Sequence, residues 1–149
     1  MSRPPFTIRD LGEIAIRVRD MDAMFAFYRD TLGLEVLRPP TDGIAFFRIG
    51  AGHAGHTKVL ALFSSAAGRP AAPSQGSAPP ATGPRSSLHH IALNIDFAAQ
   101  DAAVDWYRSQ GLDPQVQRFD WIGWRGVFVT DPDGNTVELV AKNPDWIAP

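Results

Sequence analysis

Residues 13–18 read Glu-Ile-Ala-Ile-Arg-Val, and residues 90–95 read His-Ile-Ala-Leu-Asn-Ile. In both runs apolar residues alternate with polar or small ones, which is the pattern of a strand that buries one face. The runs lie 77 positions apart, and later landmarks recur at nearly the same spacing: Phe27-Tyr28-Arg29 with Trp106-Tyr107-Arg108, Gly33-Leu34 with Gly111-Leu112, and residues 59–63 with 136–140. This near-constant spacing predicts duplication of one unit of about 50–60 residues.

Each unit reads strand, helix, then further strands. Asp20 is placed to accept a helix N-cap hydrogen bond, apolar residues then recur at helical spacing up to Leu32, and Gly33 ends the helix. Asp96 and Gly111 bracket a second helix in the same way. Period-two patterns predict later strands at residues 34–37, 44–49, 58–63, 116–119, 123–130 and 136–141. The sequence therefore predicts an α+β fold.

A tight turn is expected between the last two strands, where the chain reads Asp131-Pro132-Asp133-Gly134. The same letters resemble the opening of a calcium-binding loop. The twelfth position of such a loop requires a bidentate Glu, and here it is Lys142, so we interpret the segment as a turn.

The composition bounds the function classes. The chain has 149 residues, 44% of them hydrophobic and 20% charged, which suits one packed domain. No run approaches the ~18 apolar residues that span a bilayer, and a net charge of −2 gives no reason to expect nucleic acid or a membrane surface as a partner. The absence of cysteine excludes disulfides, thiol nucleophiles and cysteine-ligated zinc, and with no secretory signal at the start it favours the cytoplasm.

One segment differs from the rest. Residues 64–87 contain five prolines, three glycines and no large apolar side chain, so they cannot bury enough surface to offset the entropy of ordering them. We interpret them as a flexible connector between a first module at about 10–63 and a second at about 88–142. A lid over a pocket is the alternative interpretation.

Strand alternation places polar side chains on the sheet faces opposite the helices. The residues on these faces are Glu13, Arg17, His90, Asn94, Thr136 and Glu138. A face with two carboxylates and an imidazole among small residues indicates a pocket rather than a core. Because buried carboxylates are costly without a counter-charge, the pocket needs either a divalent cation or the guanidinium of Arg17.

Three segments carry a family resemblance: EIAIRVRDMDAMFAFYRDTLGLEV (13–36), LHHIALNI (88–95) and GVFVTDPDGNTVELV (126–140). With them the chain resembles the vicinal oxygen chelate superfamily, which contains glyoxalase I, the bleomycin-resistance proteins and extradiol dioxygenases. The resemblance implies two βαβββ modules in tandem, whose mixed sheets curl around a central cavity that a homodimer often completes.

The resemblance also implies a ligand set, because family ligands come from the first and last strands of each module. By that match Glu13, His90 and Glu138 can ligate a metal ion, and Ala61 stands where the fourth ligand is expected. Two carboxylates and one imidazole suit Mn²⁺, Mg²⁺, Zn²⁺ or Ni²⁺. A site without metal is the alternative.

These residues favour a glyoxalase-like lyase or isomerase acting on a small oxygenated substrate. The metal ion would act as a Lewis acid that stabilises an enediolate or enolate, with Glu13 or Glu138 as the general base. Arg17, Asn94 and Trp124 are the candidate substrate-binding residues. The main alternative is a metal-free protein that binds a drug or metabolite. A dioxygenase or a thiol transferase is a weaker option, because Glu13 stands in place of a histidine.

The remaining histidines and tryptophans have ordinary interpretations. Strand alternation directs His89 away from His90, so we interpret it as structural. His53 and His56 lie in a glycine-rich loop that is expected to be solvated, and it stays open whether either supplies a ligand. Trp121 and Trp124 either line the pocket or pack in the core or a dimer interface.

Overall fold

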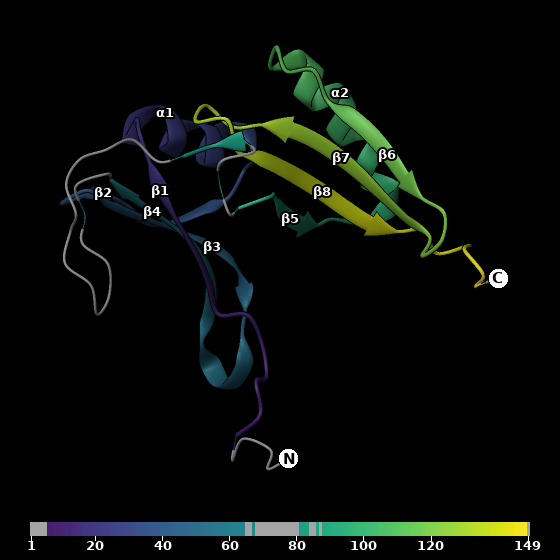
Figure 1. The fold of residues 1–149 in the computed structure, drawn as a ribbon, viewed down its shortest axis with the longest axis horizontal. Coiled ribbons are helices and arrows are strands. Elements are labelled where there is room, and N and C mark those ends of the chain that lie inside the picture. Colours follow the sequence, from purple (N-terminus) through teal and green to yellow (C-terminus); the bar gives the residue numbers. More distant parts are fainter. Residues whose placement is uncertain (1–5, 65–66, 68–80, 84–85, 87, 149) are drawn as a thin grey trace. The chain divides into compact units, whose positions relative to one another are not determined.

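The computed structural model describes residues 6–64, 67, 81–83, 86 and 88–148. The connector predicted at 64–87 therefore lies largely outside the described residues. The chain divides into two compact units, Met1–Pro80 and Ala81–Pro149. Each unit is an α+β module with one four-stranded sheet, as the sequence predicts (Figure 1).

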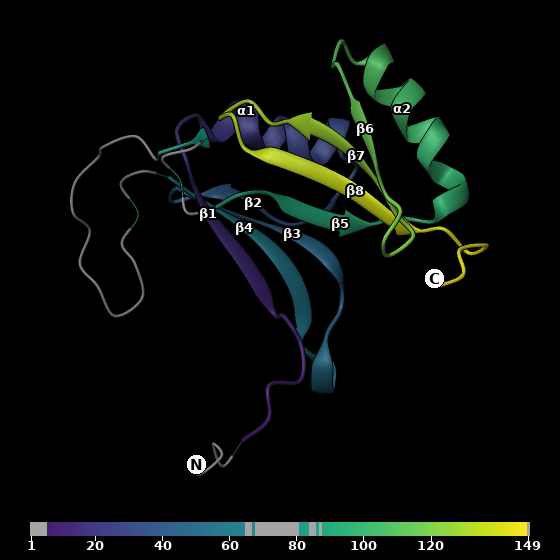
Figure 2. The ribbon, with the colours of Figure 1, turned by 45° about the vertical axis from the view of Figure 1, so that its right-hand side comes forward.

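In its described residues, the first unit contains four strands and three short helices. Its elements are β1 (Glu13–Val18), α1 (Met21–Ala26), η1 (Phe27–Thr31), β2 (Glu35–Thr41), β3 (Ile44–Ala51), η2 (His53–Gly55) and β4 (Thr57–Ser64). The strand order is β1-β4-β3-β2. Only the β1–β4 pair is parallel, and Figure 2 shows β1, β4 and β3 side by side.

The second unit repeats this plan. Its elements are β5 (Ile91–Asn94), η4 (Phe97–Ala99), α2 (Gln100–Ser109), β6 (Gln115–Phe119), β7 (Trp124–Thr130) and β8 (Thr136–Lys142). The strand order is β5-β8-β7-β6, again with a parallel pair between the first and last strands. In Figure 1, α2 runs along the β6–β7 side of this sheet.

The duplication holds at the level of single residues. In the first unit Ala15 of β1 lies opposite Ala61 of β4. In the second, Ala92 of β5 lies opposite Glu138 of β8. Each residue of the second pair follows its counterpart by the 77 positions found in the sequence, so Ala61 and Glu138 occupy equivalent places.

The helices begin where the sequence predicts but differ in detail. Asp20 caps α1, because its Oδ1 accepts a hydrogen bond of 3.0 Å from the Ala23 amide. The predicted single helix up to Leu32 changes at Phe27 into a wider π-helical turn. Asp96 caps a 3₁₀ turn before α2 without a side-chain hydrogen bond. Apolar spacing does not distinguish these helix types, because all of them present one face to the sheet.

Each unit has its own core between helix and sheet. In the first unit α1 packs against β4 and β2, and in the second α2 packs against β7. Fully buried side chains of these cores are Val18, Met24, Tyr28, Phe47, Leu60 and Leu62 in the first unit, and Ile91, Gln100, Tyr107, Val127 and Val137 in the second. The inward faces of the strands are those that alternation predicts.

The segment Asp131-Pro132-Asp133-Gly134 forms the predicted turn. The buried Asp131 carboxylate accepts hydrogen bonds from the amide nitrogens of Asp133 (3.0 Å) and Asn135 (2.9 Å). These bonds hold the chain between β7 and β8, and thereby fix where β8 begins.

Candidate functional site

The face of the second sheet that points away from α2, which we call the open face, carries two of the three candidate ligands, His90 and Glu138. Glu138 in the centre of β8 has Ala92 on one side and Phe128 on the other. Its neighbours Val137 and Leu139 point to the α2 side, where the buried amide of Gln100 donates to the Leu139 carbonyl oxygen at 3.2 Å. Period-two alternation therefore places the carboxylate on the face away from the helix.

His90 and Glu138 meet on this face. The distance between His90 Nε2 and Glu138 Oε2 is 3.3 Å, and the exposed fractions of the two side chains are 36% and 7%. Burial raises the pKa of the Glu138 carboxyl, and the neighbouring His90 offsets this only in part. The site thus holds a carboxylate that is costly to ionise without a cation beside it.

Gly126 of β7 gives the Glu138 carboxylate its space. A Cβ atom at Gly126 would collide with Glu138 Oε1 and with the ring of Phe128. The rings of Phe128 and His90 also meet edge to face, with ring centroids 6.5 Å apart. Sequence reasoning missed both residues, although an isolated glycine inside a strand pattern is a known sign of close approach.

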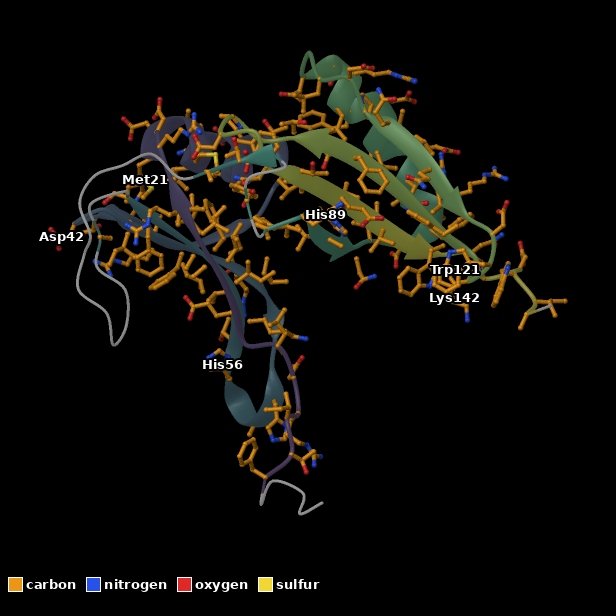
Figure 3. The ribbon with its side chains drawn as sticks, viewed as in Figure 1. Met21, Asp42, His56, His89, Trp121 and Lys142 are labelled. Atoms are coloured by element: carbon orange, nitrogen blue, oxygen red, sulfur yellow. The ribbon has the colours of Figure 1, made fainter. Side chains whose placement is uncertain are left out.

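His89 differs from its sequence interpretation. Its Nδ1 lies 2.7 Å from Nδ1 of His90, so the two rings share a hydrogen bond. Alternation fails here because β5 begins only at Ile91, and the backbone before it is not a strand. His89, labelled beside β5 in Figure 3, also lines a cavity of about 560 Å³ that includes Leu88 and Thr136.

Glu13 is the candidate ligand of the first unit. It begins β1 and is exposed, with Val59 as its register partner on β4. The equivalent of Glu138 in this unit is the buried Ala61, which has no donor atom in its side chain. Within the described parts of the chain, no three His, Asp or Glu side chains are grouped so that they could hold a metal ion. The three-residue ligand set therefore stays a prediction.

Arg17 and the loop histidines occupy defined places in the first unit. Arg17 Nη1 donates to the backbone oxygens of Ser64 (3.3 Å) and Ala67 (2.7 Å). His53 and His56 are both exposed near the β3–β4 connection, where the ring of His56 lies against Gly12 (Figure 3). The roles predicted for Arg17 in binding substrate or neutralising a carboxylate stay predictions.

The other two candidate substrate-binding residues lie in the second unit. Asn94 Nδ2 is 3.4 Å from the Val140 carbonyl oxygen, and its side chain is exposed at the end of β5. Trp124 is 44% exposed at the start of β7, opposite Lys142. Trp124 also borders a small cleft of about 80 Å³ together with Arg118 and Trp146.

A family model agrees with this architecture. The model of the Glyoxalase/Bleomycin resistance protein/Dioxygenase superfamily matches residues 10–139. The chain belongs to this superfamily. The match includes both modules and all three candidate ligands, which confirms the resemblance drawn from the strand and turn motifs.

Solved structures of the glyoxalase superfamily resemble this chain over nearly its whole length. Lactoylglutathione lyase from Agrobacterium tumefaciens is 28% identical, with a TM-score of 0.64 and coverage of 93% of this chain and 95% of the lyase. A glyoxalase/dioxygenase from Nostoc punctiforme is 24% identical, with a TM-score of 0.66 and coverage of 96% and 97%. The fold of the two modules is therefore that of the superfamily.

A third structure contains bound ligands. It is a variant of the fosfomycin resistance protein FosX from Listeria monocytogenes, complexed with Mn(II) and 1S,2S-dihydroxypropylphosphonic acid. It is 19% identical, with a TM-score of 0.63 and coverage of 94% of this chain and 95% of FosX. A search of curated proteins gave no match. In the described residues, no helix is long and apolar enough to span a membrane.

Proposed function

We propose that this chain is a divalent-metal-dependent lyase or isomerase of the glyoxalase kind, acting on a small oxygenated substrate. The observation that carries the proposal is the pairing of His90 Nε2 with Glu138 Oε2 at 3.3 Å, on a carboxylate whose side chain is only 7% exposed. A histidine just before β5 and a glutamate of β8 are thus already adjacent on the sheet face away from α2.

The donor atoms of this pair fit a metal ion. Bonds of about 2.1 Å to nitrogen and oxygen place neighbouring ligand atoms roughly 3.0–3.4 Å apart around a tetrahedral or octahedral ion. The measured separation of 3.3 Å lies in that range. Burial raises the pKa of Glu138, and a cation beside the carboxylate would favour its ionised form instead.

Glu13 completes the proposed ligand set from the first unit. A bound divalent cation would supply Lewis-acid stabilisation of an enediolate or enolate oxygen. Glu13 or Glu138 acts as the base, taking a proton from the carbon next to the substrate carbonyl and returning it to the neighbouring carbon. The carbon-bound hydrogen thus moves to the former carbonyl carbon and the hydroxyl proton moves to the former carbonyl oxygen, so the isomerisation needs no oxidant or co-reactant.

Two residues on the open face of the second sheet, and one residue of the first unit, can hold a substrate. Asn94 has an exposed amide, and Trp124 offers a flat apolar surface at the start of β7. Arg17, held by the carbonyl oxygens of Ser64 and Ala67, is proposed to bind the anionic part of a substrate. The proposal retains the homodimer that the resemblance implies and the cytoplasm that the composition favours.

The similarity to a lyase of the same superfamily supports this reaction class. The lyase from Agrobacterium tumefaciens acts on lactoylglutathione by its name and shares 28% of its residues with this chain. The glutathione thiohemiacetal of a 2-oxoaldehyde, which isomerises to a thioester of the lactoylglutathione type, is therefore the first substrate to test. Mn²⁺, the ion named for the FosX structure, is the first ion to test.

Metal-free binding of a drug or metabolite is the second candidate function. It is favoured by Ala61, which removes one family ligand position. In that case the open face binds a small molecule without changing it.

Metal analysis separates the two functions. Protein purified without chelators is expected to hold about one divalent ion per chain and to isomerise the thiohemiacetal, and Glu138→Ala should lose both properties. Glu35→Ala is the matched control, because Glu35 is exposed and ion-paired with Arg48 at 3.5 Å on β2 and β3. Sub-stoichiometric metal that Glu138→Ala leaves unchanged would falsify the enzyme proposal and favour metal-free binding.

A further inference from the structure

The contact between His89 and His90 has chemical consequences. Nδ1 of each ring lies 2.7 Å from Nδ1 of the other, so only one of these two nitrogens carries the proton between them. The ring planes are 73° apart with centroids at 5.0 Å, so the rings meet edge to face and do not stack. The hydrogen bond therefore sets the orientation of the His90 ring.

The second nitrogen of His90 makes the arrangement directional. Nε2 of His90 lies 3.3 Å from Oε2 of Glu138, whereas Nδ1 of the same ring faces His89. The hydrogen bond at Nδ1 therefore keeps Nε2 directed at the Glu138 carboxylate, where the proposed cation would bind.

We infer that His89 is a positioning residue for His90: the Nδ1–Nδ1 hydrogen bond holds the His90 ring in the orientation that directs Nε2 at Glu138. This inference rests on the proposed metal function of His90. His89 can be the donor or the acceptor of this hydrogen bond, because a neutral imidazole carries one donor and one acceptor nitrogen.

No other described residue replaces His89 in this role. The remaining aromatic contact of His90 is with Phe128 at 6.5 Å, whose ring cannot hydrogen-bond to a ring nitrogen. The contact with Glu138 uses Nε2, the nitrogen that the cation would take. Outer-shell partners of metal-bound histidines commonly contribute 10–100-fold to metal affinity, so the effect is large enough to measure.

The test uses the full chain, Zn²⁺ alone as the probe and three variants at His89 and Gln110. His89→Phe keeps an aromatic ring and removes the hydrogen bond, whereas His89→Asn restores a short amide near the position of Nδ1. Gln110→Ala is the matched control, because it removes another exposed hydrogen bond between neighbouring side chains, that of Gln110 with Ser109 at 3.3 Å. The readouts are the Zn²⁺ dissociation constant by calorimetry and the ¹⁵N shifts of the His90 ring nitrogens with and without Zn²⁺.

We expect His89→Phe to weaken Zn²⁺ binding about 10-fold or more and to shift the Nδ1 resonance of His90 in the metal-free protein. His89→Asn should recover most of both, and Gln110→Ala should change neither. Thermal unfolding of the variants checks that they are folded. An unchanged His90 resonance in His89→Phe would overturn the inference without any reference to Zn²⁺.

Two further outcomes separate this inference from the proposed function. If His90→Ala abolishes Zn²⁺ binding and His89→Phe leaves it intact, the positioning role is wrong and the metal function stands. If Zn²⁺ binds equally well to His90→Ala, the proposed function itself fails. A loss in His89→Asn as complete as in His90→Ala would make His89 a direct ligand, which also overturns the positioning role.

Discussion

Two buried polar side chains of the second unit differ in what surrounds them. Glu138 is adjacent to an imidazole on an open face, whereas the hydroxyl of Tyr107 lies in the α2 core without a hydrogen-bond partner among the described residues. Burial raises the pKa of both groups, and for Tyr107 the pKa reaches about 12. A raised pKa alone thus does not mark a functional residue. The groups that surround the side chain distinguish a candidate site from a core position.

Tyr107→Phe is expected to keep or raise stability at neutral pH. The substitution removes a buried hydroxyl that lacks a partner, which is worth up to about 1 kcal/mol in the free energy of unfolding. It should also remove a pH dependence. The folded pKa is about 12 against an ordinary value of 10.0, so the contribution of Tyr107 is complete below pH 10.0 and is lost as the pH rises through 12.

Urea unfolding at neutral and alkaline pH measures both effects. The native chain should lose stability relative to the phenylalanine variant as the pH rises above 10.0. A variant that is clearly less stable at neutral pH would mean that the hydroxyl has a hydrogen-bond partner after all, such as an ordered water.

At the scale of elements, Gly126 links a strand to the candidate site. Any residue could adopt the backbone conformation of Gly126. The glycine is needed because a side chain would occupy the space that Glu138 Oε1 and the ring of Phe128 fill. A strand position is therefore kept small by a carboxylate on the neighbouring strand.

Gly126→Ala is expected to displace the Glu138 carboxylate and to weaken Mn²⁺ or Zn²⁺ binding at least 10-fold, while unfolding becomes easier by about 1–3 kcal/mol through overpacking. Gly50→Ala on β3 is the control, since a Cβ atom there meets nothing within 4 Å. Calorimetric metal titration and urea unfolding of both variants test this. Native metal affinity in a folded Gly126→Ala protein would contradict the proposed role of Glu138.

The strands and turns could be predicted because their signals are local. Alternation placed seven of the eight strands within two residues of their observed ends, and the Asp131 turn follows from side-chain chemistry within five residues. The longer extent of β2, through Pro39 and Pro40 to Thr41, was not predicted. It is possible because β2 is an edge strand, where a missing backbone donor costs little.

The candidate site was predictable only in part, because it depends on contacts between strands. Strand alternation placed His90 and Glu138 on one face, and the family resemblance implied that they are ligands; their contact at 3.3 Å agrees with the shared face. The role of Gly126 depends on the β7–β8 pairing, and the partnership of His89 depends on where β5 begins. The residue pattern of a single strand predicts neither feature, so sequence reasoning missed both.

At the scale of the whole molecule, the proposed site needs a ligand from each unit. Glu13 belongs to β1 of the first unit, and His90 and Glu138 belong to the second. Ligand binding to the folded state alone stabilises it by about 2.7 kcal/mol when the ligand concentration is 100 times its dissociation constant. A shared ion would therefore make the unfolding of the two units depend on each other.

Glu13→Gln is expected to remove most of this metal-linked stabilisation although it lies outside the unit that holds the His90–Glu138 pair. Thermal unfolding with and without Zn²⁺ measures the effect, and Glu35→Gln is the control from the same unit, with its exposed ion pair to Arg48. The native chain and the control should unfold at a higher temperature with Zn²⁺, in one transition. Glu13→Gln should lose that shift in unfolding temperature. Without a shared ion, the unfolding of the first unit should no longer depend on the second.

The comparison with Glu138→Gln decides how many units the ion engages. If both substitutions abolish the shift, the ion binds across the two modules, and Ala61 is compatible with function because three ligands suffice. If Glu138→Gln abolishes it and Glu13→Gln does not, the ion is held by the second unit alone, so Glu13 is at most the base. In that case Arg17 becomes the residue of the first module to substitute next.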